Sequence, residues 1–395
     1  MNTAPLAQRA LILGGGMVGS VMAADMASDF TTTLADINPE NLARAKARAK
    51  AQGREIKTVQ ADLSDSNKIK ELAANADIVL GALSSHIGFA ALRAVIEVGK
   101  NYCDISFMGE DAPELDALAK KHNVTAVVDM GVAPGMSNLL AAALVAEFES
   151  CSELNIYVGG LPRERTWPFQ YKAGFSPADV IEEYTRPSRL VEHGKIIIKP
   201  ALTEPELFEF ANIGTLEAVN TDGLRSLVTT IPNVPTMREK TLRYPGHYEI
   251  MRIFRETGLF SKDPITLKNG QKVVPLEVTS ALLFPKWTYA PGEQDLTVMR
   301  IEAIGQKSGQ PSTTRTRIAW DLSDLYHVPT QATSMSRTTA FPCTIIARLI
   351  ANGTITARGV LPPEHLAPQK GLVDIILKEL LARQVVYIRT QTALS

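Results

Sequence analysis

The stretch ALILGGGMVGSVMAADMASDFTTTLADIN, residues 10–38, decides the fold of this chain. Its apolar run at 10–13 is typical of a short buried strand, and three consecutive glycines follow it. Residues 17–29 predict a helix, and residues 31–36 predict a second strand. A strand, a glycine-rich turn, a helix and a strand in this order predict the start of a doubly wound parallel sheet.

Gly14, Gly16 and Gly19 fit the spacing GxGxxG. The first glycine permits a tight turn, the second lets the backbone approach a pyrophosphate, and the third lets helix and strand pack closely. The first helical turn, with Met17 and Val18, offers free N–H groups and a partial positive charge. We therefore expect a bound dinucleotide, the alternative being a tight turn that binds nothing.

Asp36 ends the second predicted strand, about twenty residues after the glycine turn. A carboxylate at this point accepts hydrogen bonds from a ribose diol and repels a 2′-phosphate, which favours NAD over NADP. Arg44 or Lys46 could still reach a phosphate, so NADP stays open. Asp62, after the third strand, is predicted either as a neighbour of the adenine or as a helix cap.

Strand and helix continue to alternate as far as residue 131. Asn38 is predicted to cap the second helix, with Pro39 in its first turn. Further strands are predicted at 56–63, 77–83, 101–106 and 125–131. This alternation predicts an α/β domain with helices on both faces of a parallel sheet.

Polar residues end two of these strands. Leu83 ends the fourth strand, Ser84 and Ser85 follow it, and Asp104 lies in the fifth. Because ligands bind outside the carboxyl ends of the strands in such sheets, we expect the first three residues to line the nicotinamide ribose. His86 has the same location, but surface or capping use is its default interpretation.

The pattern changes after Gly135. A run of residues from 136 predicts an apolar helix, and strands follow from residue 153 onward with many prolines between them. Further strands are predicted at 225–231, 272–284 and 295–305. We predict a Rossmann domain at 1–135, an α+β substrate and dimerisation domain at 136–334, and a segment at 335–395 that packs back on the first domain.

The composition excludes several classes of protein. The 395 residues include 41 Lys and Arg and 42 Asp and Glu, so no basic patch for nucleic acid is indicated. No long apolar stretch predicts a membrane span, and the first residues do not resemble a signal peptide, so we expect a cytoplasmic protein. Cys103, Cys151 and Cys343 form no CxxC pair, so neither a metal site nor a disulfide framework is predicted.

Several longer motifs carry a family resemblance. They are NYCDISFMGED, DMGVAPGMSNLLA, GGLPRER, EKTLRYPGHYE, SMSRTTAFP and GVLPPEHL, spread in order over nearly the whole chain. With these motifs the sequence resembles the saccharopine dehydrogenase-like oxidoreductases, and most of all their lysine 6-dehydrogenase branch. The resemblance implies a Rossmann domain, a mixed-sheet substrate domain that commonly forms homodimers or larger homo-oligomers, and oxidation of a C–N bond at the lysine ε position with a nicotinamide cofactor.

An amino-acid substrate needs specific partners. Its α-carboxylate favours an arginine, and Arg243 in the family motif is the predicted one, with Tyr244 and His247 as predicted catalytic neighbours. Asp104 is predicted to face the substrate nitrogen as a counter-charge or base. Further predicted substrate contacts are Glu110, Asp111 and Lys172.

Two other functions remain open at this point. A saccharopine dehydrogenase would need more cations for the two extra carboxylates of its substrate. The candidate cations are Arg163, Arg165, Arg186 and Arg189. A nucleotide-sensing protein without catalysis could also use a Rossmann scaffold, because fold does not fix function.

Overall fold

The computed structural model describes residues 8–290, 292–311 and 314–394. The first residues, on which the expectation of no signal peptide rests, lie partly outside this range. The chain forms two compact units. One unit takes the chain up to Ala143 and again from His327 to Val386, and the other comprises Leu144–Tyr326 and the C-terminal residues from Tyr387.

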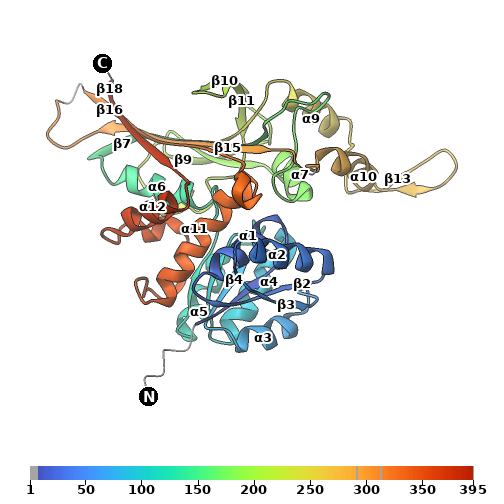
Figure 1. Cartoon of the computed structure of the whole chain (residues 1–395). Coiled ribbons are helices and arrows are strands. Elements are labelled where there is room, and N and C mark those ends of the chain that lie inside the picture. Colours follow the sequence, from blue (N-terminus) through green and yellow to red (C-terminus); the bar gives the residue numbers. More distant parts are fainter. Residues whose placement is uncertain (1–7, 291, 312–313, 395) are drawn as a thin grey trace. The chain divides into compact units, whose positions relative to one another are not determined.

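A parallel sheet forms the centre of the first unit (Figure 1). Its order is β17-β6-β5-β4-β1-β2-β3. The bounds are β1 (Arg9–Leu13), β2 (Thr31–Asp36), β3 (Lys57–Gln60), β4 (Ile78–Gly81), β5 (Asn101–Asp104), β6 (Thr125–Val127) and β17 (Gly359–Leu361). The order reverses beside β1, so this strand and β4 mark the switch point at which doubly wound sheets bind ligands.

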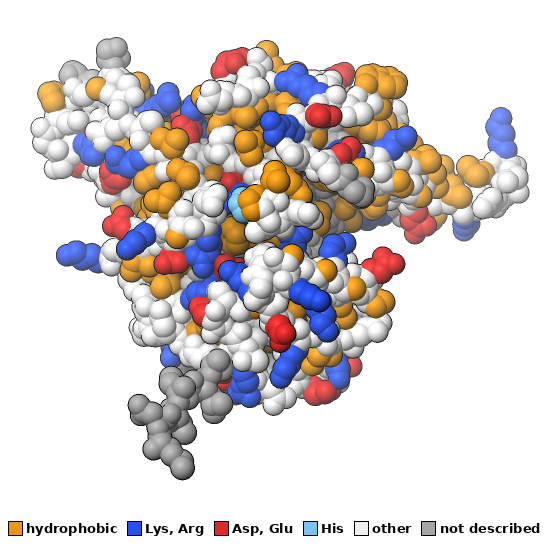
Figure 2. Space-filling view, in the orientation of Figure 1, with side chains coloured by type: hydrophobic (Ala, Val, Ile, Leu, Met, Phe, Trp, Pro, Cys, Tyr) orange, Lys and Arg blue, Asp and Glu red, His pale blue; other side chains and the backbone are white. Residues whose placement is uncertain are grey.

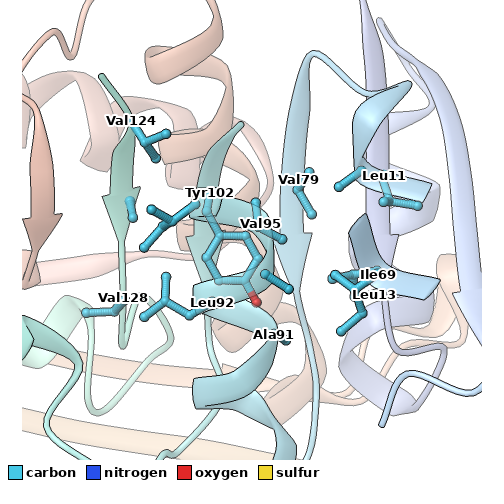
Figure 3. Packing of buried hydrophobic residues seen from close by; sticks show 14 of the residues in the cluster. Leu11, Leu13, Ile69, Val79, Ala91, Leu92, Val95, Tyr102, Val124 and Val128 are labelled. Carbon is cyan, nitrogen blue, oxygen red and sulfur yellow. The ribbon is translucent and has the colours of Figure 1, made fainter. Parts of the chain in front are cut away.

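Helices cover this sheet as the alternating pattern predicts. They are α1 (Met17–Met26), α2 (Pro39–Ala51), α3 (Ser66–Ala74), α4 (Ser85–Glu97) and α5 (Asp116–Lys121). From the C-terminal segment, α11 (Ser334–Ala351) contacts β4 and β5, and α12 (Leu372–Ala382) contacts α11, while α6 (Met136–Val145) leads into the second unit. The Asn38 side chain accepts a hydrogen bond from the Glu40 N–H, which confirms the predicted cap. In Figure 3, Leu92 and Val95 of α4 lie around Tyr102, and this packing fixes the position of β5 in the core.

A mixed sheet organises the second unit. Its main path is β10-β11-β12-β7-β15-β16-β18, and only the β12–β7 pair on this path is parallel. The bounds are β7 (Ser150–Pro162), β8 (Ser188–Glu192), β9 (Lys195–Lys199), β10 (Glu206–Phe210), β11 (Gly214–Asn220), β12 (Thr236–Arg243), β15 (Asp295–Gln306), β16 (Arg315–Leu325) and β18 (Tyr387–Leu394). The fold class predicted from the sequence is therefore confirmed.

Two strands predicted in this unit are helices instead. Residues 225–231 contain α8 (Leu227–Thr230), and residues 272–284 contain the two-residue β14 (Lys272–Val273) followed by α10 (Pro275–Trp287). Pro275 is tolerated at the first helical position, where its missing N–H costs nothing. The other elements are α7 (Pro177–Thr185), α9 (His247–Glu256) and β13 (Ile265–Thr266), which pairs with β14.

The C-terminal segment contributes to both units, which corrects the prediction that all of 335–395 packs on the first domain. In the first unit, α11 contacts α1, and Arg348 and Arg383 form ion pairs of 2.7 and 3.1 Å with Asp25, whose side chain is almost fully buried. β17 adds an unpredicted seventh strand beside β6. β18, however, pairs with β16 in the second unit because an antiparallel edge of that sheet accepts it.

Three further features concern the length of the helices, the cysteines and the charges on the surface. None of the helices in the described residues is both long and apolar enough to cross a membrane. The three cysteines are free thiols with buried side chains, as expected. Figure 2 shows lysine and arginine side chains mixed with aspartate and glutamate over the face in view.

Candidate functional site

The glycine turn between β1 and α1 has the shape that a pyrophosphate needs. Gly14 has φ +96°, and a Cβ there would lie 2.3 Å from the Ala82 carbonyl oxygen. A Cβ on Gly19 would lie 1.9 Å from the Gly14 carbonyl oxygen, so close packing of helix and turn requires both glycines. A Cβ on Gly16, by contrast, would meet no atom within 4 Å. The open space therefore lies at the glycine whose predicted role is to leave room for the ligand.

The start of α1 keeps its N–H groups available. Gly16 occupies the N-cap position, and within the described residues no side chain caps the helix and no acid lies in its first turn. Gly16, Met17 and Val18 are partly exposed. Unpaired N–H groups at a helix N-terminus favour an anion, so these residues fit the phosphates of a dinucleotide.

Asp36 lies directly beside this turn. One carboxylate oxygen accepts the Gly15 N–H at 2.5 Å, and the other accepts the Asn38 N–H at 2.7 Å. The Asn41 amide donates to both oxygens at 3.3 Å. These contacts hold the carboxylate at the end of β2, next to the glycine turn, where the sequence predicts the adenosine ribose.

Asp62 occupies a local turn. Its carboxylate accepts hydrogen bonds from the Ser64 N–H at 2.9 Å and from the Ser64 hydroxyl at 2.7 Å, and these donors lower the pKa of the carboxyl group below its usual value. Asp65, not Asp62, caps α3 by accepting from the Asn67 N–H. The helix-cap alternative for Asp62 is therefore wrong, and its place near an adenine stays a prediction.

The segment Leu83–Ser85 after β4 is held by a hydrogen bond to Ser106. Leu83, Ser84 and Ser85 are partly exposed, and the Leu83 N–H donates to the Ser106 hydroxyl oxygen at 3.2 Å. Ser84 occupies the N-cap position of α4, and its carbonyl oxygen accepts from the Ile87 N–H. His86, in the first turn of α4, is exposed.

Asp104 is fully buried at the end of β5. Its carboxylate accepts three hydrogen bonds of 2.8 Å, from the Tyr102 hydroxyl, the Ser106 N–H and the Ser106 hydroxyl. Burial is the largest influence and raises the pKa of Asp104 to about 7, although the three donors oppose this shift. These contacts occupy the carboxylate within its own unit, and the predicted contact with a substrate nitrogen stays a prediction.

This buried carboxyl group predicts a specific pH dependence. Asp104 keeps its proton to a higher pH in the folded chain than the ordinary value of 3.8, so the stability it contributes is full below about pH 4 and is lost as the pH rises through about 7. We expect this group to lower the free energy of unfolding by up to about 4 kcal/mol over that window. Urea unfolding of the wild type and of Asp104→Asn across the window measures it, and equal slopes for both proteins would contradict the assignment.

Glu110 and Asp111 lie on an exposed loop of the first unit. Asp111 precedes a short 3₁₀ helix (Ala112–Leu115), and its carbonyl oxygen accepts from the Glu114 N–H. The structure of this unit leaves both carboxylates open to solvent, and their predicted contact with substrate stays a prediction.

Arg243 lies at the end of β12, buried in the second unit with an exposed fraction of 2%. Its Nε donates to the Tyr184 hydroxyl at 3.0 Å, Nη1 donates to the Leu242 carbonyl at 3.0 Å, and Nη2 pairs with Glu183 at 3.2 Å. The guanidinium carbon lies 4.6 Å from the centre of the Tyr171 ring. Arg243 is therefore a fixed positive charge within an aromatic cluster, held mainly by partners from its own unit.

His247 belongs to the same cluster. Its Nδ1 lies 2.9 Å from the Phe169 carbonyl oxygen, and its Nε2 lies 2.9 Å from the Tyr184 hydroxyl. Because a carbonyl oxygen only accepts, Nδ1 carries the proton, and the tyrosine donates to Nε2. Burial, followed by the charge of Arg243, lowers the pKa of His247 to about 3. These contacts favour a neutral ring that positions Tyr184, and the predicted catalytic role of His247 stays untested.

Tyr244 braces the end of β7. Its hydroxyl donates to the Pro162 carbonyl oxygen at 3.0 Å, and the guanidinium carbon of Arg165 lies 4.0 Å from its ring centre. The Tyr244 side chain is buried. Its predicted catalytic role stays a prediction.

A cavity of about 630 Å³ opens in the second unit beside this cluster. It is lined by Pro162, Arg163, Glu164, Lys172, Tyr289, Gly292, Glu293 and Gln294. Lys172 forms an ion pair with Glu293 and donates to the Thr288 carbonyl oxygen at 3.3 Å. The structure thus places the predicted substrate contact Lys172 in a cavity that contains two cations and two carboxylates.

Tyr289 is a lining residue that sequence reasoning missed. Its hydroxyl oxygen is buried and has no hydrogen-bond partner among the described residues. Buried hydroxyl groups are normally paired, so this one is an unsatisfied donor behind the cavity lining. No sequence motif marks it, because the cavity lining joins two segments, 162–172 and 289–294, that are distant in the sequence.

The four arginines proposed for a larger anionic substrate have partners of their own. Arg189 forms two hydrogen bonds of 2.9 Å with Asp222, and Arg163 donates to the Gln294 side chain at 2.7 Å. Arg165 stacks on Tyr244, and Arg186 interacts electrostatically with Glu183. Arg163 alone of these four lines the cavity.

Comparisons with known proteins agree with this architecture. The family model of the saccharopine dehydrogenase NADP binding domain matches residues 10–127, and that of the saccharopine dehydrogenase C-terminal domain matches residues 131–385. Saccharopine dehydrogenase (NADP(+), L-glutamate-forming) of Schizosaccharomyces pombe is 22% identical, covering 82% of this chain and 87% of that protein. Carboxynorspermidine synthase of Vibrio cholerae is 25% identical, covering 91% of this chain and 92% of that protein.

A solved structure has the same fold. The apo saccharopine dehydrogenase (L-Glu forming) of Saccharomyces cerevisiae superposes with a TM-score of 0.78 at 19% identity, covering 98% of this chain and all of that chain. The two family models together account for most of the residues between 10 and 385. The protein therefore belongs to the saccharopine dehydrogenase family of oxidoreductases, which work with a nicotinamide cofactor.

Proposed function

We propose that this protein is an NAD-dependent dehydrogenase that oxidises the C–N bond at the ε carbon of lysine. The observation that carries the proposal is the charge balance of the cavity in the second unit. Arg163 and Lys172 are matched there by Glu164 and Glu293. Such a lining suits a zwitterionic amino acid, since a substrate with several carboxylates would favour an excess of cations.

The Lys172–Glu293 ion pair is the proposed contact for the amino-acid end of the substrate. The α-carboxylate of lysine would face Lys172, and its α-ammonium would face Glu293, so that each charge keeps an opposite partner. Arg243 would contribute a fixed positive charge behind the cavity lining. Its guanidinium lies against the ring of Tyr171, the residue before Lys172.

The chemistry requires a neutral amine. An ammonium has no lone pair to stabilise the developing C=N bond, and deprotonating lysine at pH 7 costs about 4–5 kcal/mol. A nicotinamide cofactor held at the glycine turn would supply the acceptor for the hydride of the ε carbon. Water then adds to the substrate iminium, ammonia leaves, and the aldehyde closes on its own α-amine to give 1-piperideine-6-carboxylate.

A saccharopine dehydrogenase is the second candidate, and the names of the relatives favour it. Saccharopine carries two more carboxylates than lysine, whereas Arg189 is already neutralised by Asp222 and Arg165 stacks on Tyr244. The test is to incubate the purified protein with NAD and either lysine or saccharopine. Ammonia release with lysine supports the proposal, and glutamate release from saccharopine would replace it with the second candidate. Turnover of neither substrate would favour a nucleotide-sensing protein.

The preference for NAD rests on Asp36. The family model describes an NADP binding domain, but a carboxylate fixed by Gly15 and Asn38 repels a 2′-phosphate and accepts from a ribose diol. The hydroxyl groups of the ribose would replace the longer contacts from Asn41.

Replacing Asp36 tests this preference. We expect Asp36→Ala to weaken NADH binding by at least about 10-fold and NADPH binding much less, since one charge-assisted hydrogen-bond acceptor contributes about 1.5–3 kcal/mol. Titration of the protein with each nucleotide, followed by fluorescence, measures both dissociation constants. An unchanged ratio of the two constants would show that Asp36 does not contact the ribose.

A further inference from the structure

Ser106 connects two parts of the first unit that are separate in sequence. Its hydroxyl donates to Asp104 at 2.8 Å and accepts the Leu83 N–H at 3.2 Å. Leu83 begins the partly exposed segment that follows β4, whereas Asp104 is buried at the end of β5. The hydroxyl therefore carries a connection from the core to the segment predicted to line the nicotinamide ribose.

The direction of each hydrogen bond is determined by its partners. Above about pH 7, where Asp104 is ionised, its carboxylate only accepts, so the Ser106 proton points toward Asp104. A backbone N–H only donates, so an oxygen lone pair of Ser106 faces Leu83. A free hydroxyl would rotate among several partners, but here Asp104 selects the orientation in which Ser106 can accept from Leu83.

Two glycines make room for this arrangement. A Cβ on Gly81 would lie 2.1 Å from the Asp104 carboxylate, and a Cβ on Gly88 would lie 2.8 Å from the Ser106 Cβ. Ser106 itself is only 1% exposed. The sequence thus leaves space for both side chains where β4 ends and α4 begins.

We propose that Ser106, oriented by Asp104, is a positioning residue that sets the segment Leu83–Ser85 for the nicotinamide half of the cofactor. The inference rests on the proposed cofactor site, and it gives Asp104 a role through Ser106 without a contact to substrate. Ser106→Ala removes the connection to Leu83 and leaves the Tyr102 hydroxyl and the Ser106 N–H as donors to Asp104.

The chain offers a matched control. Tyr102→Phe removes a hydrogen bond of the same length to the same carboxylate oxygen, but within the described residues no hydrogen bond joins Tyr102 to Leu83. A general loosening of the core would affect both variants alike. A positioning role would affect the serine variant alone.

The experiment compares two ligands in the absence of lysine. NADH carries the nicotinamide half, while ADP shares only the adenosine and the phosphates that the glycine turn would bind. We expect Ser106→Ala to weaken NADH binding by about fivefold and ADP binding by less than about twofold, since a lost neutral hydrogen bond contributes about 1 kcal/mol. Tyr102→Phe should leave both constants within about twofold. Ser106→Cys, which keeps a weak donor and acceptor, should restore part of the NADH affinity.

Each outcome decides the proposal. Equal losses for NADH and ADP, or equal losses in the serine and tyrosine variants, would overturn it, as would unchanged NADH binding in Ser106→Ala. The binding measurements contain no amino acid. If the separate assay shows that lysine is not oxidised, the proposed substrate is refuted, but the binding constants that test Ser106 are unaffected. Isothermal titration calorimetry measures all the constants, and melting temperatures identify any variant that fails to fold.

Discussion

A Gly16→Ala variant is expected to bind NADH about 100-fold more weakly, a loss of about 2.7 kcal/mol, while remaining as stable as the wild type. The reason is the contrast among the three glycines of the turn. Gly14 and Gly19 have no space for a Cβ, but Gly16 has open space and an ordinary φ of −62°. Alanine therefore fits the folded chain, and its methyl group conflicts only with a ligand bound against the turn.

Gly109→Ala is the matched control, because Gly109 also lies in the first unit with no atom within 4 Å of a built Cβ. Its NADH affinity should stay within about twofold of the wild type. Fluorescence titration gives the dissociation constants, and thermal unfolding shows whether either variant is destabilised. If Gly16→Ala binds NADH as tightly as the control does, the pyrophosphate does not lie against this turn.

A Lys172→Met variant is expected to raise the KM for lysine by about 100-fold and to leave the dissociation constant of NADH unchanged. Methionine keeps most of the length of the side chain but cannot hold an α-carboxylate. Loss of a charged hydrogen-bond partner typically costs about 1.5–3 kcal/mol, which agrees with this size of effect. Glu293 would retain its place for the α-ammonium, so kcat should fall much less than KM rises.

Lys262→Met controls for the loss of a positive charge from the same unit, since Lys262 forms an exposed pair with Glu182 outside the cavity. Its KM should match that of the wild type, because exposed pairs contribute little. Initial rates at varied lysine and saturating NAD measure both parameters. A normal KM in Lys172→Met would place the amino-acid end of the substrate elsewhere.

The sequence predicts the local structure around the glycine turn well because its signals are local. The roles of Gly14 and Gly19 depend on a turn only a few residues long, and the Asn38 cap depends on its nearest neighbours. The position of Asp36 at the end of β2 follows from the length of one helix and two strands. Each of these residues meets partners that the alternating strand and helix pattern already locates.

The substrate half is less predictable because its contacts join distant residues. His247 is fixed by Tyr184 and Phe169, which lie 63 and 78 positions away in the sequence, so its buried, neutral state has no local signal. The buried state of Asp104 depends on how α4 packs over Tyr102. The strand predicted at 272–284 is mostly the helix α10, whose Leu283 and Trp287 pack in a core cluster with residues distant in the sequence.

The interrupted course of the first unit has a consequence for biosynthesis. When a ribosome has made only the residues up to Ala143, β6 still lacks its neighbour β17, and the Asp25 carboxylate still lacks Arg348 and Arg383. Those partners emerge only after the entire middle of the chain has been translated. Until then, the nascent dinucleotide-binding unit has an unpaired edge at β6 and an Asp25 carboxylate without its arginine partners. A premature stop before His327 would make this state permanent.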